Sequence, residues 1–142
     1  MLSRTVEVHV SVQYFYEQQM QLFDGGAYDK WALTFAEDAV FEIDLLPGAL
    51  QGRSAIAAAA LRMRDGLDRD DVRHRNWLGM LTVEPRADGW VSARCYGLVL
   101  ATPRGGRPEL RHTTVCEDLL RPGAAPGEWL VQDRYVVRDS LG

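Results

Sequence analysis

The stretch Leu22–Asp44, LFDGGAYDKWALTFAEDAVFEID, decides how we expect the chain to fold. It opens at the end of an apolar-faced segment, and its glycines Gly25 and Gly26 suit the left-handed conformation that ends a helix. Apolar residues then recur at three- and four-residue spacing, which predicts a short helix over 28–35. Apolar residues that alternate with acidic ones predict a strand over 39–45 with one solvent-exposed side. The stretch therefore joins a helical N-terminal part to a strand-rich remainder.

The segments on either side extend this division. An apolar face behind Ser3 and Thr5, either of which is a suitable cap, predicts a first helix over 5–23. The alanine-rich segment after Ser54 predicts a third helix, followed by an acidic loop over 65–71. Four strands over 72–85, 90–102, 109–121 and 129–139, joined by turn-rich loops, predict an antiparallel meander. We expect one α+β domain over 1–142, with its helices packed on one face of a curved sheet.

Composition narrows the range of partners and chemistry. The net charge of −4 argues against a nucleic-acid partner, because phosphate binding needs a concentrated basic surface. We see neither a signal-peptide pattern nor an apolar run of membrane-spanning length. Cys95 and Cys116 are too few for a structural zinc site and predict buried thiols in a reducing cytoplasm. Nucleotide, metal and covalent-nucleophile motifs are missing, so any chemistry should be acid–base work without a cofactor.

Strand register predicts which side chains share a face of the sheet. A two-residue turn at Gly105-Gly106 places Cys95 beside Cys116 and Arg94 beside Glu117. Pairing Glu84 with Trp90 places Met80 opposite Arg94, which divides the strands into two faces. The face that mixes large apolar and polar groups, as a ligand pocket does, carries His74, Asn76, Leu78, Met80, Arg94, Tyr96, Leu98, Thr113, Val115, Glu117 and Leu119. The opposite face is small and apolar around Cys95 and Cys116, and it predicts a homodimer through the sheet.

Several of these segments resemble one family. The helix ending in LFDGGAYDKW, the FAEDAVFEI element, QGRSAI and the ending CEDLLR…GEWLVQDR resemble the SnoaL-like and nuclear-transport-factor-like superfamily. RHRNWLGMLTVEP followed by ARCYGLVL is similar to SnoaL-like proteins of actinomycete aromatic polyketide clusters, and more distantly to β subunits of ring-hydroxylating dioxygenases. The resemblance implies a cone-shaped α+β domain with three N-terminal helices on a strongly curved, mostly antiparallel sheet. Members include polyketide cyclases, ketosteroid isomerases, scytalone dehydratases and domains without catalysis.

The resemblance carries over to few functional positions. Asp24 matches the acid that scytalone-dehydratase-like enzymes place at the end of the first helix. Asn76 stands where those enzymes usually have histidine, and His74 lies two residues before it. Glu117 matches the strand acid that in ketosteroid isomerases donates a hydrogen bond to the developing oxyanion. The general base of those isomerases would fall at Ile43, which argues against steroid-type isomerisation.

Each candidate also has an ordinary structural interpretation. His74 is able to move protons near neutrality, or it is a partly exposed histidine in an arginine-rich strand start. Asp24 is either an acid–base group or a turn residue that caps the helix end. Glu117 would donate a hydrogen bond if protonated in a dry pocket, but an ion pair with Arg94 is the favoured interpretation.

Together these observations predict a cofactor-independent cyclase, dehydratase or isomerase that acts on a polycyclic aromatic polyketide-type substrate. His74 and Asp24 are expected to exchange protons with the substrate, while Asn76 and Tyr96, with Glu117, polarise a carbonyl. The residues expected to contact the ligand are Tyr16, Asn76, Met80, Arg94, Tyr96 and Thr113. A non-catalytic ligand-binding or assembly subunit is the alternative, and Asn76 in place of histidine supports it.

Overall fold

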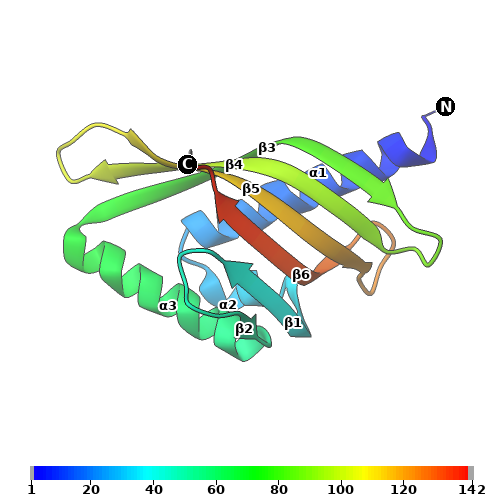
Figure 1. Ribbon diagram of the computed structural model, residues 1–142, viewed down its shortest axis with the longest axis horizontal. Helices are drawn as coiled ribbons and strands as arrows, with labels where there is room; N and C mark the ends of the chain where they lie inside the picture. The colour runs from blue at the N-terminus through cyan, green and yellow to red at the C-terminus, as the bar shows by residue number, and fades with distance from the viewer. Residues whose placement is uncertain (1, 141–142) are drawn as a thin grey trace.

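The computed structural model describes residues 2–140, in which three helices accompany a six-stranded sheet (Figure 1). The elements in chain order are α1 (Arg4–Asp24), α2 (Tyr28–Ala32), β1 (Phe35–Ile43), β2 (Leu50–Gln51), α3 (Arg53–Asp70), β3 (Val72–Pro85), β4 (Val91–Pro103), β5 (Glu109–Pro122) and β6 (Trp129–Arg138). The strands lie in the order β2-β1-β6-β5-β4-β3. Neighbours are antiparallel except β1 and β6, which pair in parallel. The predicted α+β class and the antiparallel meander of the last four strands are confirmed.

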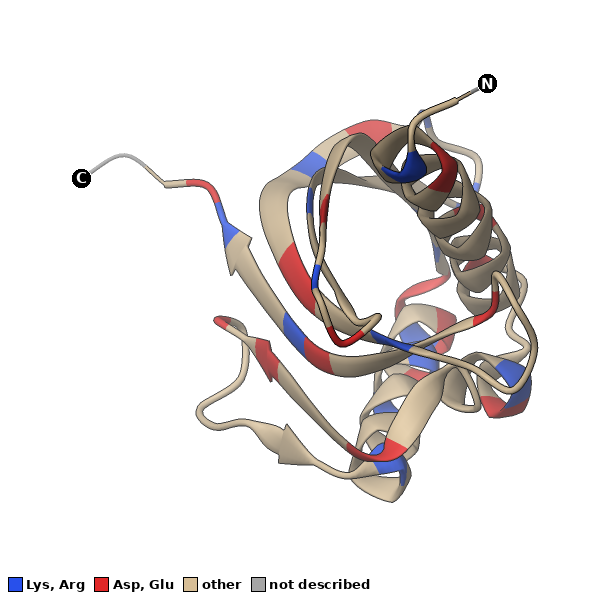
Figure 2. Cartoon of the chain, turned by 90° about the vertical axis from the view of Figure 1, so that its right-hand side faces the viewer, with Lys and Arg blue, Asp and Glu red and all other residues tan. Residues whose placement is uncertain are grey.

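The sheet bends into an arch that does not close, and α1 lies across its open side (Figure 2). α3 packs against β1, β2 and the start of β3. The core forms where these layers meet, and its most completely buried side chains include Val12, Phe35, Ile56, Leu120 and Val131. Burial of this apolar surface is the main term that holds the helices to the sheet.

Helix boundaries agree with the sequence at some ends and not at others. The Ser3 hydroxyl accepts a hydrogen bond from the Val6 amide at 3.2 Å, so the predicted cap of α1 forms. At its other end Gly26, with φ of 81°, takes the left-handed conformation. The prediction of an acidic loop over 65–71 is wrong, because α3 continues to Asp70 and ends at Asp71 with φ of 56°. Acidic residues on the exposed side of a helix do not end it.

The predicted start of β1 at residue 39 is also wrong, since the strand begins at Phe35. Phe35 and Ala36 are buried, and Phe35 pairs with Val131 of β6. Pairing with β6, from the far end of the chain, therefore extends β1 toward its N-terminus. The pattern of neighbouring residues did not indicate this extension.

From Val91 to Val99 the register between β4 and β5 is the predicted one, with Cys95 opposite Cys116 and Arg94 opposite Glu117, and it shifts by one residue between Val99 and Leu100. The register between β3 and β4 differs, because Thr82 rather than Met80 faces Arg94, and Asn76 faces Val99 rather than Leu98. Between these points Met80, with φ of 53°, lies in a β-bulge that adds one residue to β3. One added residue turns every earlier side chain of the strand to the other face of the sheet.

The bulge corrects the predicted faces. His74, Asn76 and Leu78 share the inner face with the odd-numbered residues of β4 and the even-numbered residues of β5. The outer face instead holds the residues Met80, Arg94, Tyr96, Thr113 and Glu117, so the prediction that these line one pocket with His74 is wrong. The small apolar face around Cys95 and Cys116 is the inner one, turned toward α1 and unavailable to a second subunit.

Candidate active site

A cavity of about 470 Å³ lies between the inner face of the sheet and the three helices. This volume is within the range of about 300–1,000 Å³ that small-molecule sites occupy. Most of the wall is apolar, and it includes Met20, Phe23, Trp31, Phe41, Ile43, Leu45, Leu46, Leu50, Ile56, Met63, Leu78, Val99 and Val136. The polar side chains in the wall are Arg62, His74, Asn76, His112, Thr114, Arg134 and Arg138. A flat apolar ligand with a few oxygen atoms matches such a wall.

His74 is the group in this wall best suited to move a proton. Its side chain is half-buried, and its Nε2 atom is buried without a hydrogen-bond partner. Burial, followed by the positive charges of Arg111 and His112, lowers the pKa of His74 below its ordinary value of 6.5, while Asp24 acts in the opposite direction. The imidazole is therefore neutral at pH 7 and able to accept a proton.

Asp24 and Asn76 form a pair at the end of α1. The Asn76 backbone N–H donates to Asp24 Oδ2 at 3.0 Å, and Asn76 Nδ2 donates to Asp24 Oδ1 at 2.7 Å. Asp24 does not line the apolar cavity, but it borders two surface hollows, and His74 and Asn76 also line one of them. The carboxylate thus fixes the orientation of the Asn76 amide and ties the end of α1 to β3.

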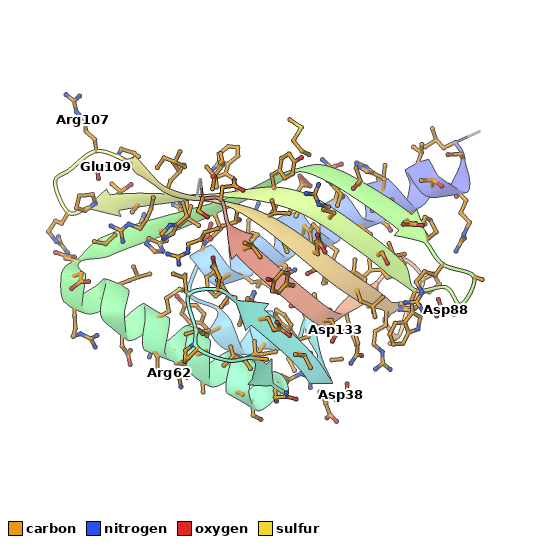
Figure 3. All side chains as sticks on the ribbon, viewed as in Figure 1. Asp38, Arg62, Asp88, Arg107, Glu109 and Asp133 are labelled. Carbon is orange, nitrogen blue, oxygen red and sulfur yellow. The ribbon has the colours of Figure 1, made fainter. Side chains whose placement is uncertain are left out.

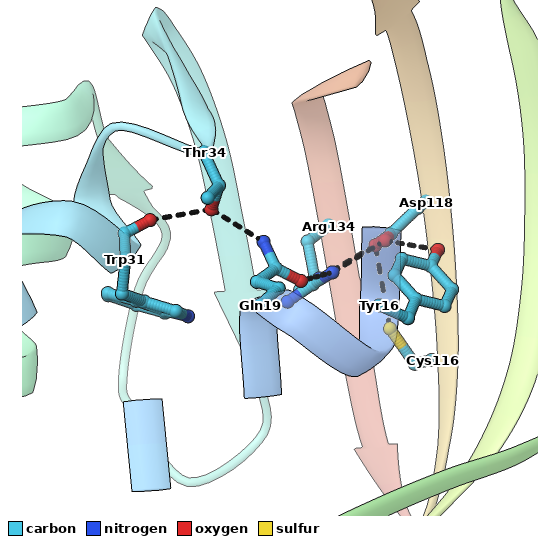
Figure 4. A network of polar contacts seen from close by, with 7 residues as sticks. All are labelled: Tyr16, Gln19, Trp31, Thr34, Cys116, Asp118 and Arg134. Carbon is cyan, nitrogen blue, oxygen red and sulfur yellow. Dashed lines mark hydrogen bonds and ion pairs between the residues drawn. The ribbon is translucent and has the colours of Figure 1, made fainter. Parts of the chain in front are cut away.

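A buried ion pair between β5 and β6 lies beside the cavity, and Figure 4 shows its contacts. Arg134 donates from Nε to Asp118 Oδ1 at 2.9 Å and from Nη2 to Asp118 Oδ2 at 2.8 Å. The Tyr16 hydroxyl donates to the same carboxylate at 2.5 Å. Burial first, and then the Asp118 charge, raise the pKa of Tyr16 well above its usual value of 10.0. Tyr16 is therefore a neutral donor that is already occupied by Asp118, and it does not line the cavity.

The same network reaches α2 through neutral groups (Figure 4). Arg134 Nη2 donates to Gln19 Oε1 at 2.8 Å, and Gln19 Nε2 donates to Thr34 Oγ1 at 2.8 Å. The Thr34 hydroxyl donates to the carbonyl oxygen of Trp31 at 2.5 Å. Trp31 Nε1 itself is buried without a partner, and its side chain lines the cavity.

The two cysteines lie opposite each other on the inner face, and both are free and buried, as predicted. The hydrogen bond with Cys95, together with burial, raises the pKa of the Cys116 thiol well above its ordinary value of 9.0. Cys116 is therefore a neutral thiol, suited to packing rather than to nucleophilic attack. Within residues 2–140, no group of three or more His, Cys, Asp or Glu side chains is placed to hold a metal ion.

The remaining predicted site residues lie on the outer face. Arg94 Nε and Glu117 Oε1 are 3.6 Å apart and half-exposed, so the ion pair favoured for Glu117 forms. The Arg94 guanidinium lies 5.5 Å from the centre of the Tyr96 ring. The Thr113 hydroxyl donates to Asp139 at 2.7 Å, and Met80 is 79% exposed. These side chains form an outer surface separate from the cavity.

Several polar residues of the cavity wall and the network were not indicated by the sequence, among them His112, Asp118 and Arg134. Alternation along β5 contains the signal, because His112 and Asp118 fall on the same face as Cys116. Arg134 could be placed only by pairing β6 with β5, which turns it toward Asp118.

The sequence of the chain matches a family model over nearly its whole length. The model describes the SnoaL-like domain and matches residues 4–135. The chain belongs to the SnoaL-like family. Among curated proteins no match was found. No helix of residues 2–140 in this SnoaL-like protein is long and apolar enough to cross a membrane.

Solved structures of actinomycete proteins are similar along the whole SnoaL-like chain. ActVI-ORFA from Streptomyces coelicolor is 29% identical, with a TM-score of 0.86 over 96% of this chain and 98% of that one. Aln2 from another Streptomyces species is 32% identical, with a TM-score of 0.82 over 97% and 94%. A protein from Catenulispora acidiphila, in complex with S-DNPA, is 28% identical with a TM-score of 0.79 over 94% of each chain. These matches confirm the resemblance that was predicted from the motifs.

Proposed function

We propose that this SnoaL-like protein is a cofactor-independent cyclase, dehydratase or isomerase that acts on a polycyclic aromatic polyketide-type intermediate. The observation that carries the proposal is a half-buried neutral imidazole, His74, in the wall of an otherwise apolar cavity. The similarity to ActVI-ORFA, Aln2 and a protein that binds S-DNPA supports the class of substrate. Two free buried cysteines agree with a reducing, cytoplasmic location.

In the proposed mechanism, His74 takes a proton from the carbon atom next to a substrate carbonyl group. The electrons of the C–H bond move to the carbonyl oxygen, and the second N–H of the Asn76 amide donates to the enolate that forms. Asp24 holds that amide in place through its first N–H and its backbone N–H. The proton held by His74 then returns to another carbon, or leaves with a substrate hydroxyl as water. Ring closure is the third course, in which the enolate carbon bonds to a second carbonyl, whose oxygen takes the proton.

Exchange of substrate hydrogen with solvent tests this mechanism even before the product is known. The protein is incubated in D₂O with aromatic polyketide intermediates, and deuterium at carbon is followed by mass spectrometry. His74→Gln should slow the exchange by about 10²-fold or more, the usual contribution of a general base. His9→Gln is the matched control, since His9 Nε2 contacts the Leu81 carbonyl oxygen at 3.1 Å, outside the cavity. It should leave the rate unchanged.

The pH profile gives a second readout of the same step. Because the pKa of His74 is lowered, its base form should persist below pH 6.5, and kcat/KM should fall only at a lower pH. Equal exchange rates for wild type and His74→Gln would rule out His74 as the base. Tight binding of the intermediates without any exchange or turnover would instead favour the non-catalytic ligand-binding alternative.

We also propose that the protein is a homodimer through the outer face of its sheet. Trp77, Tyr96 and Leu98 are each more than 40% exposed there, next to the large open hollow around Arg94 and Glu117. Clustered exposed aromatic and aliphatic side chains are characteristic of subunit interfaces.

A further inference from the structure

All ionisable side chains in the cavity wall, apart from the thiol of Cys116, are basic: Arg62, His74, His112, Arg134 and Arg138. No Asp or Glu of the described chain lines the wall, although the whole sequence has a net charge of −4. The acids that outnumber the bases elsewhere are thus excluded from this cavity. This distribution distinguishes it from the rest of the molecule.

Two of the five basic groups already have a counter-charge outside the wall. Arg134 is paired with Asp118 at 2.8 Å, and Arg138 with Asp44 at 3.2 Å. Arg62 and His112, in contrast, form no ion pair within residues 2–140. Figure 3 shows Arg62 on α3 near the loop between β1 and β2, whose Leu45 and Leu46 also line the cavity. Arg62 is exposed, which places its guanidinium at the mouth.

The electrostatic potential around His74 is also positive. Arg111 and His112 both act against protonation of His74, and only Asp24, which is hydrogen-bonded to Asn76, acts for it. A second cation is therefore disfavoured in this part of the wall, whereas an anion would be stabilised.

Two buried ring nitrogens add an independent sign of a ligand. Trp31 Nε1 and His74 Nε2 are buried without hydrogen-bond partners, and both side chains line the cavity. The indole N–H is a donor only, so it needs an acceptor. Unpartnered buried polar atoms are uncommon in native proteins, and an oxygen atom of a ligand would satisfy these two.

We propose that the cavity binds an organic anion, a flat aromatic acid whose ionised carboxylate lies between Arg62 and His112 at the mouth. The aromatic rings fill the apolar interior, and their oxygen substituents accept from Trp31 and contact His74. A carboxylate beside a guanidinium forms charge-assisted hydrogen bonds, which are about twice as strong as neutral ones. The inference deepens the proposed function, since it specifies the charge of the substrate of the same cavity.

A matched pair of probes tests the charge preference without knowledge of the substrate. Anthracene-2-carboxylate and anthracene-2-carboxamide have nearly the same shape, and only the first is charged at pH 7.5. Their affinities are measured by fluorescence titration at low salt. The acid should bind at least about tenfold more tightly than the amide. The preference should decrease with added salt, because the mouth is open to solvent.

Substitutions then assign the preference to residues. Arg62→Gln should reduce the acid-to-amide ratio several-fold, His112→Gln should also reduce it, and Arg62→Lys should retain most of it. Arg69→Gln is the matched control, because Arg69 is exposed on the same helix and does not line the cavity. It should leave the ratio unchanged.

Equal affinity for acid and amide, or a ratio that Arg62→Gln and His112→Gln both leave intact, would overturn the inference. These outcomes are separate from those that test the proposed function. Solvent exchange that depends on His74 but acts equally on charged and neutral substrates would overturn only the anion preference. A clear acid preference without any turnover would overturn only the enzymatic role.

Discussion

At the scale of single residues, the most constrained group is the buried pair of Asp118 and Arg134. Both side chains are almost inaccessible to solvent, with exposed fractions of 0% and 5%. Burial alone would lower the pKa of Arg134, but the Asp118 carboxylate together with Cys116 and Tyr16 raises it well above its ordinary value. Asp118 accepts from Tyr16, from Cys116 and from Nε and Nη2 of Arg134, so its oxygens are fully used. The pair is stable as a unit and costly to break.

We therefore expect Asp118→Asn to lower the free energy of unfolding by about 3–5 kcal/mol, because it leaves the charge of Arg134 buried and unpaired. Tyr16→Phe should cost about 1–2 kcal/mol through the lost hydrogen bond. Urea denaturation followed by tryptophan fluorescence measures both. Glu117→Gln is the control at the adjacent position, where a half-exposed pair with Arg94 should contribute about 0.5 kcal/mol. Equal losses for Asp118→Asn and Glu117→Gln would contradict this account.

The positions of some site residues could be predicted from the sequence, whereas those of others could not. His74 and Asn76 could be placed together because they lie two apart on one strand, and a turn assumed at Gly105-Gly106 gave the β4–β5 pairing correctly from Val91 to Val99. Asp118 and Arg134 could not be grouped, because charged residues within strands are usually solvent-facing. Only the packing of α1 over β5 and β6, with Tyr16 above the pair, makes their position internal.

At the scale of secondary structure, the bulge in β3 decides which strand residues enter the cavity. Before it, His74, Asn76 and Leu78 point inward; after it, Leu81 and Val83 do so. In a regular strand, strict alternation would place either the even-numbered or the odd-numbered residues inward along its whole length. The predicted faces therefore combined residues that lie on opposite sides of the sheet. The presence of a helix or a strand can be predicted from the local pattern of apolar residues. A bulge, in contrast, depends on how β3 packs around α1. The preceding Gly79 was the only local hint.

The left-handed backbone conformation of Met80 allows a prediction about the stability of the bulge in β3. Its φ of 53° is unfavourable for a residue with a Cβ atom by about 1–2 kcal/mol, and its exposed side chain gives little back. Met80→Gly should therefore raise the free energy of unfolding by up to about 1 kcal/mol, once the entropy of glycine in the unfolded chain is included. Met80→Ala retains the Cβ and should show no gain. A gain with alanine and none with glycine, in thermal or urea unfolding, would contradict the strain.

At the scale of the whole molecule, the outer face of the sheet combines exposed apolar side chains with a hollow. The sequence predicted a dimer through the sheet but assigned it to the face that α1 covers. The predicted register of β3 grouped Trp77 with Cys95 and Cys116 on that face, although its side chain lies on the opposite face and is 63% exposed. Dimerisation itself stays a prediction.

We expect the purified protein to sediment as a dimer at micromolar concentration, and Tyr96→Glu combined with Leu98→Glu to convert it to a monomer. Charges introduced at the centre of an apolar interface are strongly unfavourable. Tyr14→Glu is the control, because Tyr14 is 61% exposed on α1, away from the sheet. A wild-type monomer in analytical ultracentrifugation, or equal effects of the control, would exclude this interface.

The parallel pairing of β1 with β6 has a consequence for synthesis of the chain. Val40 pairs with Asp133 and Ile43 with Val136, so β1 joins the main sheet only through the last strand to leave the ribosome. Until then β1 is paired with β2 alone, and it presents unpaired backbone groups on its other side. Contacts of such long sequence separation also slow folding. The nascent chain is therefore open to non-native strand pairing along β1 until β6 has been synthesised.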